Sequence, residues 1–351
     1  MPRGPALVVR FSSLGDVLLA AHLPRFLREA DPGRRVLFAT KDRYAAALHG
    51  HPDVDRFYFL EDATTDPTAP APVGVRGTLG DLASFLRREG IEEVFDLHQN
   101  LRSSRLTMRL DGARRVAPAK HGLRRRLMVH ARWLRPEPLP PLLRVYRGLA
   151  GLPPGGEASE WLRASLDERE RARARAAAGD DAGRLALLGV GARWPTKRWP
   201  AAHFTALAER LEREHGLVAR YAVEPSDASL AAELRALLPA ARHGAIAALP
   251  FRDVAALAEH AKLIVSNDSA LLHLGAAVGV PAVGVFGSTV PAFGFAPSGP
   301  RDRVAEIPLA CRPCDVHGKA RCPLGHHRCM KDLTPDIALD AARRALEEVA
   351  A

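Results

Sequence analysis

Residues 6–40, ALVVRFSSLGDVLLAAHLPRFLREADPGRRVLFAT, contain the pattern from which the fold class can be inferred. Ala6–Phe11 is a short apolar run of the kind that forms a buried β-strand. After a turn at Ser12–Asp16, apolar residues recur at helical spacing over Val17–Glu29, and a second apolar run covers Arg35–Thr40. A strand, a helix and a strand in this order predict parallel strands joined by a helical crossover.

The same alternation continues on both sides of a glycine- and proline-rich break, GLPPGG, at residues 151–156. Two such series predict an α/β protein with two facing Rossmann-like domains and a central cleft, whose sites lie at the carboxyl ends of the strands. Expected helices cover residues 79–88, 101–110, 201–215, 230–238, 254–259, 270–278 and 334–349. Expected strands cover residues 93–97, 185–190, 217–223, 263–266 and 282–286, and residues 66–80 are expected to be loop.

The breaks in the pattern predict four parts. They are an N-terminal domain at 1–160, a linker at 161–183, a C-terminal domain at 184–332, and a C-terminal helix at 333–351. We expect that last helix to pack back on the N-terminal domain.

The chain of 351 residues carries a net charge of +10, from 50 Lys and Arg against 40 Asp and Glu. This balance favours an anionic partner: a nucleic acid, a membrane surface or a phosphorylated substrate. The basic stretch Arg114–Arg135 contains one aromatic residue, Trp133, and aromatics are 6% of the chain. Nucleic-acid binding is therefore the least favoured alternative. An anionic lipid or a phosphorylated sugar explains the stretch better, and a solvated helix face is the alternative.

The sequence contains no run of about 18 apolar residues, which a membrane-spanning helix would need. Its first ten residues lead directly into the first strand and lack the pattern of a secretory signal. We therefore expect a cytoplasmic protein, located peripherally on the cytoplasmic face of the inner membrane.

The turn Ser12–Asp16 carries the first candidate for chemistry. Gly15 allows a tight turn and the close approach of a substrate, and Ser13 lies beside it. Asp16 stands near the N-terminus of the following helix, where the dipole favours an ionised carboxylate. Such a group either caps the helix or accepts a proton from an attacking hydroxyl.

The loop GVGARWPTKRWP, residues 189–200, follows a predicted strand and precedes a helix. Its glycines allow backbone N–H groups to approach a phosphate, to which Thr196 would add a hydroxyl and Lys197 a charge. A solvated basic turn is an equally good interpretation. Glu224 ends the next strand, where an acid can bind ribose hydroxyls.

Two further strand ends carry polar residues. Asp268 and Ser269 open a helix whose free N–H groups form an anion site. Ser288 and Thr289 follow the next strand along the chain, at the same expected sheet edge. His273 comes one turn into the helix and, by its position, is more typical of a buried core histidine than of a ligand contact.

All four cysteines lie in one short stretch with the spacing Cys-x2-Cys-x7-Cys-x6-Cys. They are Cys311, Cys314, Cys322 and Cys329. Four thiolates could hold a structural zinc ion, and reduced structural thiols are the alternative. The second pair lacks the close spacing of a zinc ribbon.

Taken together, these segments resemble glycosyltransferase family 9, the lipopolysaccharide heptosyltransferases, over nearly the whole chain. The segments that carry the resemblance are SSLGD at 12–16, FDLHQNLRSS at 95–104, WPTKRWP at 194–200 and SNDSALLHLGAAVGVPAVGVFGST at 266–289. The cysteine-rich stretch ending in GHHRCMKDL at 325–333 is similar to the heptosyltransferase II branch of that family.

The resemblance implies the GT-B fold and inverting transfer of heptose from ADP-L-glycero-D-manno-heptose to the inner core of lipopolysaccharide. The implied acceptor is of the heptosyl-Kdo2-lipid A type. No cofactor is expected to be required. A GT-B transferase or an epimerase that uses another nucleotide sugar is the alternative.

The resemblance also implies roles for individual residues. Asp16 matches the general base, and Lys197 matches a lysine on the donor diphosphate. The expected donor-binding residues are Thr196, Lys197, Glu224, Asp268, Ser269, His273, Ser288 and Thr289. The expected acceptor-binding residues are Ser13, Gly15, Asn100, Arg102 and Arg105.

Overall fold

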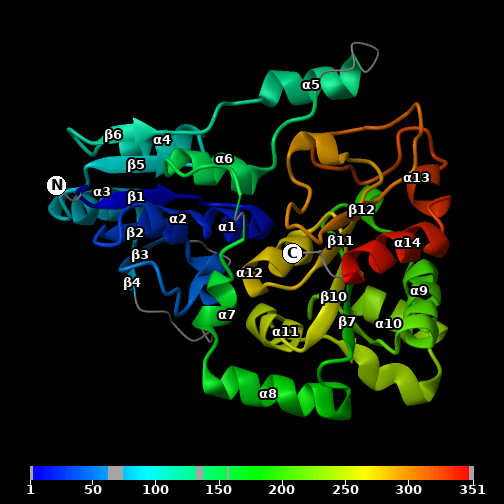
Figure 1. Cartoon of the computed structure of the whole chain (residues 1–351). Helices are drawn as coiled ribbons and strands as arrows, with labels where there is room; N and C mark the ends of the chain where they lie inside the picture. Colours follow the sequence, from blue (N-terminus) through cyan, green and yellow to red (C-terminus); the bar gives the residue numbers. More distant parts are fainter. Residues whose placement is uncertain (1–2, 62–73, 132–136, 156–157, 348–351) are drawn as a thin grey trace. The chain divides into compact units, whose positions relative to one another are not determined.

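A computed structural model describes residues 3–61, 74–131, 137–155 and 158–347 of the chain (Figure 1). The chain divides into two compact units, each formed from two segments. The first unit is Met1–Ala119 with Leu142–Asp167, and the second is Lys120–Pro141 with Glu168–Ala351. Each unit holds one parallel sheet, which confirms the predicted α/β class with two Rossmann-like halves.

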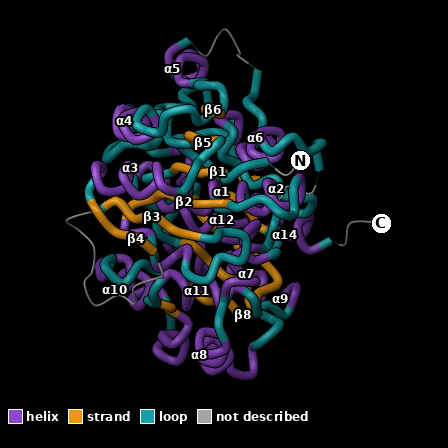
Figure 2. Tube along the Cα trace, turned by 90° about the vertical axis from the view of Figure 1, so that its left-hand side faces the viewer, coloured by secondary structure: helices purple, strands orange, loops and turns teal. Residues whose placement is uncertain are grey.

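The first unit is built on six parallel strands in the order β4-β3-β2-β1-β5-β6, and Figure 2 shows them side by side. β1 lies inside the sheet and is buried along its whole length, as expected for a parallel strand covered on both faces. The strands are β1 (Ala6–Val9), β2 (Val36–Lys41), β3 (Arg56–Leu60), β4 (Gly74–Gly77), β5 (Glu93–Asp96) and β6 (Arg114–Val116).

The helical segment predicted over residues 17–29 is in fact two helices. Pro24 lacks an N–H group, and in a continuous helix its ring would collide with the carbonyl of Ala20, where the first helix ends. The helices of this unit are α1 (Leu14–Ala20), α2 (Leu23–Ala30), α3 (Leu79–Arg88), α4 (Leu101–Thr107), α6 (Leu142–Leu149) and α7 (Trp161–Ser165).

Part of the predicted loop over residues 66–80 is a strand. β4 occupies Gly74–Gly77 and pairs with β3, where a side chain at Gly74 would collide with the ring of Phe59. Glycine is therefore required for this close approach, although two glycines in four residues read as loop in the sequence. Residues 66–73 of the predicted loop lie outside the described residues, and its last three residues form the N-cap and the start of α3.

The second unit repeats the arrangement with six parallel strands in the order β12-β11-β10-β7-β8-β9. Its strands are β7 (Leu185–Gly189), β8 (Val218–Ala222), β9 (Ile246–Ala247), β10 (Ala261–Asn267), β11 (Ala282–Val285) and β12 (Arg303–Ala305). Its helices are α5 (Gly122–His130), α8 (Glu168–Ala178), α9 (Ala201–His215), α10 (Ala228–Leu237), α11 (Phe251–Ala258), α12 (Ala270–Val278), α13 (Arg328–Lys331) and α14 (Pro335–Leu346).

The C-terminal helix packs within the second unit, which differs from the expectation that it packs back on the N-terminal domain. α14 contacts α9 and the strands β10, β11 and β12. Its buried face consists of small residues and one leucine, which fit closely against the sheet: Ala338, Leu339, Ala341, Ala342 and Ala345.

The unit boundary also differs from the predicted linker at 161–183. α7 belongs to the first unit and α8 to the second, so the crossing falls between Asp167 and Glu168. α5 was expected in the N-terminal domain but belongs to the second unit, because Met128 and Val129 pack against Leu139 and Phe293. Trp133 and Arg135 of the predicted basic stretch lie outside the described residues.

Each sheet has one point from which successive crossovers run in opposite directions. In the first sheet this switch point lies between β1 and β5, and in the second it lies between β7 and β10. The loops that leave the carboxyl ends of such a strand pair leave a crevice between them, which is where α/β sheets bind ligands. Ligand binding is therefore expected at the two switch points.

Candidate active site

Asp16 lies in the first turn of α1, beside the carboxyl end of β1. Its Oδ2 accepts hydrogen bonds from the N–H and the hydroxyl of Ser13, at 3.0 and 2.8 Å. The same oxygen pairs with Nη2 of Arg10 at 2.8 Å. Asp16 therefore caps the helix, as one of the two sequence interpretations proposed, and it is also half of an ion pair.

The charge state of Asp16 follows from these contacts. Burial alone would raise its pKa, but the Arg10 cation and the Ser13 hydrogen bonds outweigh burial and hold the pKa below its usual 3.8. The carboxylate is thus ionised at neutral pH. Among the described residues its Oδ1 has no hydrogen-bond partner, and the side chain is 21% exposed, so one oxygen can accept a proton.

Arg10 was not identified from the sequence, and it organises this switch point. Its Nε donates to the carbonyl of Ser12 at 2.7 Å, and its Nη1 donates to the carbonyl of Leu97 after β5. One guanidinium therefore links the loops that follow β1 and β5. The only sequence signal that could have marked it is its charge within the otherwise apolar run Ala6–Phe11.

The loop after β5 is shaped by Asp96. Its Oδ1 accepts from the N–H groups of His98 and Gln99 at 3.1 and 2.8 Å, and its Oδ2 accepts from the hydroxyl of Ser103 at 3.1 Å. Asn100 caps α4, accepting from the N–H groups of Arg102 and Ser103. The predicted acceptor residue Asn100 thus has a structural role that fixes the start of α4.

His98 is a second residue that the sequence analysis did not single out. Burial, and then the nearby Arg10 cation, lower its pKa to about 4, so the ring is neutral at pH 7. Its Nε2 lies 2.6 Å from Nδ2 of Asn100 and therefore acts as the acceptor, which leaves the proton on Nδ1. Nδ1 is buried and has no partner among the described residues.

Two cations of α4 lie exposed beside this loop. Arg102 and Arg105 are one turn apart, and neither forms an ion pair within the described part of the chain. Ser13 is exposed and Gly15 is buried in α1. The structure therefore brings the predicted residues of this half to one sheet edge, around an ionised carboxylate and two uncompensated cations.

Lys197 and Asp268 meet at the switch point of the second sheet. Nζ of Lys197 lies 2.7 Å from Oδ2 of Asp268, and the hydroxyl of Thr289 donates to the same oxygen at 2.7 Å. Lys197 ends a short 3-10 turn after β7, whereas Asp268 follows β10. An ammonium group has three donors, so Lys197 retains donors for a further anion beside Asp268.

Asn267 holds the two loops of this switch point together. Its Oδ1 accepts from the N–H of Trp199 at 2.9 Å, and its Nδ2 donates to the carbonyl of Val190 at 2.7 Å. Two residues further on, Ser269 is the N-cap residue of the nine-residue helix α12 and makes no side-chain capping hydrogen bond. The uncapped N–H groups of this helix and the Lys197 ammonium are chemically suited to hold phosphate oxygens.

Thr196 does not fit its predicted role as a phosphate ligand. Its hydroxyl donates to the carbonyl of Lys319 at 2.9 Å and accepts from the N–H of Lys319 at 2.8 Å and from the hydroxyl of Ser288 at 3.2 Å. A hydroxyl has one donor and two acceptor sites, so its capacity is used inside the protein. The side chains of Thr196 and Ser288 are both buried. Their hydrogen bonds hold the turn that carries Lys197 in position.

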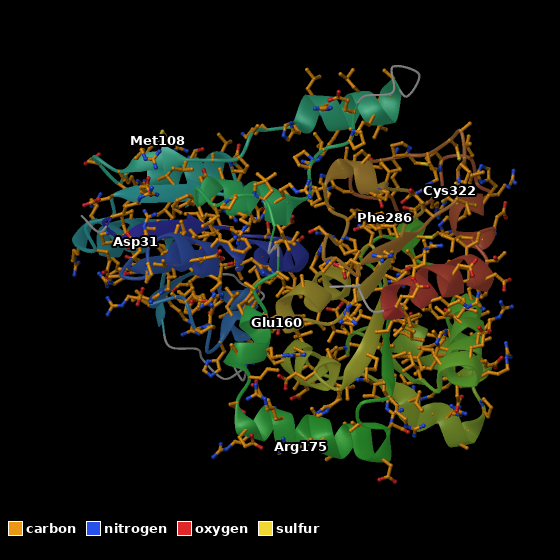
Figure 3. The ribbon with its side chains drawn as sticks, viewed as in Figure 1. Asp31, Met108, Glu160, Arg175, Phe286 and Cys322 are labelled. Carbon is orange, nitrogen blue, oxygen red and sulfur yellow. The ribbon has the colours of Figure 1, made fainter. Side chains whose placement is uncertain are left out.

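The segment that holds Thr196 is the cysteine loop, which we define as residues 306–327, between β12 and α13. Arg312 of this loop is buried and was missed by the sequence analysis. Its guanidinium donates to the carbonyls of Phe286 and Thr289 at 3.1 and 3.0 Å and also to Gly287. The cysteine loop therefore braces the end of β11, where Figure 3 labels Phe286.

The cysteines themselves are free thiols. Burial, above all, raises the pKa of Cys329 to about 11, so this thiol is protonated at neutral pH. Within the described residues no group of three or more His, Cys, Asp or Glu side chains is placed to hold a metal ion. The structure thus gives the zinc hypothesis no geometric support, and it remains a prediction.

The remaining predicted donor residues also belong to the second unit, but they differ in their exposure. Glu224 is exposed just after β8, the strand that neighbours β7. His273 is buried in α12, as its position in the sequence indicated. Thr289 is buried and engaged with Asp268.

No helix among the described residues combines the length and the apolar character needed to cross a membrane.

The model of glycosyltransferase family 9 (heptosyltransferase) matches residues 80–324. Lipooligosaccharide heptosyltransferase 2 of Campylobacter jejuni is 27% identical over 158 residues, which are 43% of this chain and 47% of the relative. The chain thus matches about half the length of this curated relative.

Solved structures match over more of the chain. E. coli ADP-heptose lipopolysaccharide heptosyltransferase II superposes with a TM-score of 0.69 and 20% identity, covering 97% of this chain and 98% of that chain. An E. coli heptosyltransferase solved with ADP-2-deoxy-2-fluoro heptose gives a TM-score of 0.62 and 17% identity, covering 97% and 99%. At these identities the likeness establishes the fold, which is the predicted GT-B fold. Because the family model spans more than half of the 351 residues, the chain belongs to glycosyltransferase family 9, the heptosyltransferase family.

Proposed function

We propose that the protein transfers a heptosyl group from ADP-heptose to an inner-core sugar of lipopolysaccharide, with inversion at the anomeric carbon. The observation that carries the proposal is the Lys197–Asp268 pair, which lies at a switch point beside the uncapped start of α12. A cation and a helix N-terminus at one edge suit a diphosphate. The choice of heptose and ADP rests on membership of the family and on the named relatives.

In the proposed reaction the second unit binds the donor. Lys197 and the first N–H groups of α12 would contact the diphosphate and stabilise the negative charge that develops as ADP leaves. Asp268 holds the Lys197 ammonium in place through the 2.7 Å contact. Glu224, exposed after the neighbouring strand, is the proposed ribose contact.

The first unit would supply the proton acceptor. The acceptor oxygen forms a bond to the anomeric carbon, the bond from that carbon to the diphosphate oxygen breaks, and the bonding electrons leave with ADP. The hydroxyl proton passes to Oδ1 of Asp16. A weak base is sufficient here, because the hydroxyl proton becomes strongly acidic as the new bond forms.

The acceptor is expected to be anionic. Arg102 and Arg105 are exposed and lack ion-pair partners among the described residues, so they are available for carboxylates or phosphates. A lipid A-linked acceptor is anchored in a membrane, so the proposal also locates the protein peripherally on the cytoplasmic face of the inner membrane.

The test is a donor panel with purified protein and a de-acylated inner-core acceptor. ADP-heptose should give product, whereas UDP- and GDP-sugars should not, and NMR of the product should show an inverted anomeric centre. Transfer from a UDP- or GDP-sugar, or epimerisation of a sugar nucleotide without transfer, would overturn the proposed substrate. A retained anomeric configuration would overturn the proposed role of Asp16.

A further inference from the structure

Helix α5 carries an exposed apolar pair that the proposed reaction does not use. Leu123 and Leu127 are 72% and 37% exposed. They are four residues apart and so lie on one face of the helix. Arg126 and His130 are also exposed, and at about 100° per residue they fall on the same side, so that the four residues cover an arc of roughly 100°.

The opposite face of α5 is fixed to the second unit. Met128 and Val129 are buried against Leu139 and Phe293. Arg125 donates two hydrogen bonds to the carbonyl of Phe293 at 3.1 and 3.0 Å, and its guanidinium stacks over the ring of Phe295. The exposed leucines are therefore presented by a helix whose orientation is set by contacts on its far side.

Cations flank the leucine pair on both sides. Arg126 is exposed at one edge, and Arg124, which pairs with the highly exposed Glu137, lies at the other. Lys120 is exposed just before the helix. The exposed face of α5 thus presents two leucines between arginines, while its opposite face is buried. This pattern matches the chemistry of a bilayer surface, which has an apolar zone beneath anionic headgroups.

We propose that this face, formed by Leu123, Arg126, Leu127 and His130, docks the protein on an anionic lipid bilayer. The leucine side chains enter the interfacial region, and the flanking arginines bind lipid phosphates. The inference rests on the proposed function for its purpose, because an acceptor built on lipid A is held in such a bilayer. The physical attraction itself does not depend on which sugar is transferred.

The experiment is co-sedimentation of the full-length protein with vesicles of phosphatidylglycerol and phosphatidylcholine, or of phosphatidylcholine alone. Wild type should bind the anionic vesicles, and binding should weaken in 0.5 M NaCl, which screens the arginines. Leu123→Ser with Leu127→Ser should reduce anionic-vesicle binding by about tenfold or more. Arg126→Gln should reduce it by about fivefold.

Leu237→Ser is the matched control, because Leu237 is 43% exposed at the end of α10 in the same unit. It should leave vesicle binding unchanged. Equal binding by the double serine variant, or equal binding of wild type to neutral vesicles, would overturn the proposal. A change in sedimentation mass of the double variant without lipid would identify the face as a contact between copies, and this outcome too would overturn it.

Transfer to a soluble, de-acylated acceptor separates this inference from the proposed function. The double serine variant should keep wild-type rates with that acceptor and lose rate with acceptor embedded in vesicles. Loss of rate with both acceptors would mean that α5 acts in catalysis or stability and would overturn the docking role. Absence of transfer by wild type would refute the proposed function while leaving the vesicle result interpretable.

Discussion

The two switch points share an architecture and differ in how much of their polar chemistry is already satisfied. At the first, between β1 and β5, Asp16 keeps one oxygen free and Arg102 and Arg105 have no ion-pair partner within the described residues. At the second, between β7 and β10, Lys197 is paired, and the hydroxyls of Thr196, Ser288 and Thr289 are buried in hydrogen bonds.

This difference matches two kinds of task. A site that accepts a proton from a substrate hydroxyl needs an accessible, ionised oxygen. The first switch point has such an oxygen in Oδ1 of Asp16. A site that stabilises charge on a leaving group needs dipoles and cations fixed before the reaction. The second switch point supplies them, braced by Asn267 and by the cysteine loop.

The largest expected effect is on turnover when the free carboxylate is removed. Asp16→Asn should lower kcat by about two to four orders of magnitude and leave donor affinity within about twofold. Initial rates with saturating ADP-heptose measure this. The matched control is Asp81→Asn, because Asp81 caps α3 through Thr78 with the same geometry, at 2.9 and 2.7 Å. Equal rate losses in both variants would reduce Asp16 to a helix cap.

The next effect is on the stability of the second switch point. Arg312→Met leaves the carbonyls of Phe286, Gly287 and Thr289 without their buried donor and should lower the free energy of unfolding by about 3 kcal/mol. Urea unfolding measures it. Arg303→Met is the control, because Arg303 bonds only to the nearby carbonyls of Pro300 and Asp302 among the described residues. Equal stability of the two variants would contradict the bracing role.

The third prediction concerns acid sensitivity of the first unit. His51 is buried and stacked on Trp161, and burial lowers its pKa to about 4. Its Nδ1 accepts from the N–H of Asp53 at 3.1 Å, which requires the neutral ring. Between pH 6.5 and 4 the unfolded chain therefore binds more protons than the folded protein. The free energy of unfolding consequently decreases as the pH is lowered, and His51 contributes about 2 kcal/mol of this decrease between pH 7 and pH 5.

Urea unfolding of wild type and His51→Phe at pH 7 and pH 5 provides the measurement. The phenylalanine variant keeps an aromatic ring against Trp161 and should lose about 2 kcal/mol less than wild type over this interval. The same pH dependence in both proteins would show that His51 is not a group that drives the acid sensitivity.

The smallest expected effect is on acceptor affinity. Arg102→Ala or Arg105→Ala should raise the KM for an anionic acceptor by about five- to tenfold, which is the usual scale for an exposed charge contact, with kcat and ADP affinity unchanged. Arg109→Ala, an exposed arginine beyond the end of α4, is the control. If a neutral acceptor analogue showed the same KM increase, charge recognition would not be the cause.

Local sequence patterns predicted what depends on neighbours in the chain. α9 and α12 have the predicted bounds, and Asp16, Lys197 and Asp268 lie in the segments that follow β1, β7 and β10, as expected. Residues that act across the chain could not be predicted this way. Thr196 looked like a phosphate ligand because its partner, Lys319, is 123 residues away.

Arg10 and Arg312 show the same limit. Each donates to carbonyls of loops distant in the sequence, at Leu97 for the first and at Phe286 for the second. A backbone carbonyl carries no residue-specific signal, so a sequence pattern cannot reveal such a contact. The break between α1 and α2, in contrast, was readable from Pro24 and was overlooked because the apolar spacing continues across it.

We propose that the second unit binds the donor and that the first unit supplies the proton acceptor. Calorimetric titration of ADP into wild type, Asp16→Asn and Lys197→Met tests it most directly. We expect near-normal ADP affinity for Asp16→Asn and a loss of about tenfold or more for Lys197→Met, because this substitution would remove the proposed charge-assisted contact to phosphate. Wild-type ADP affinity in Lys197→Met, together with lost affinity in Asp16→Asn, would contradict this division between the two units.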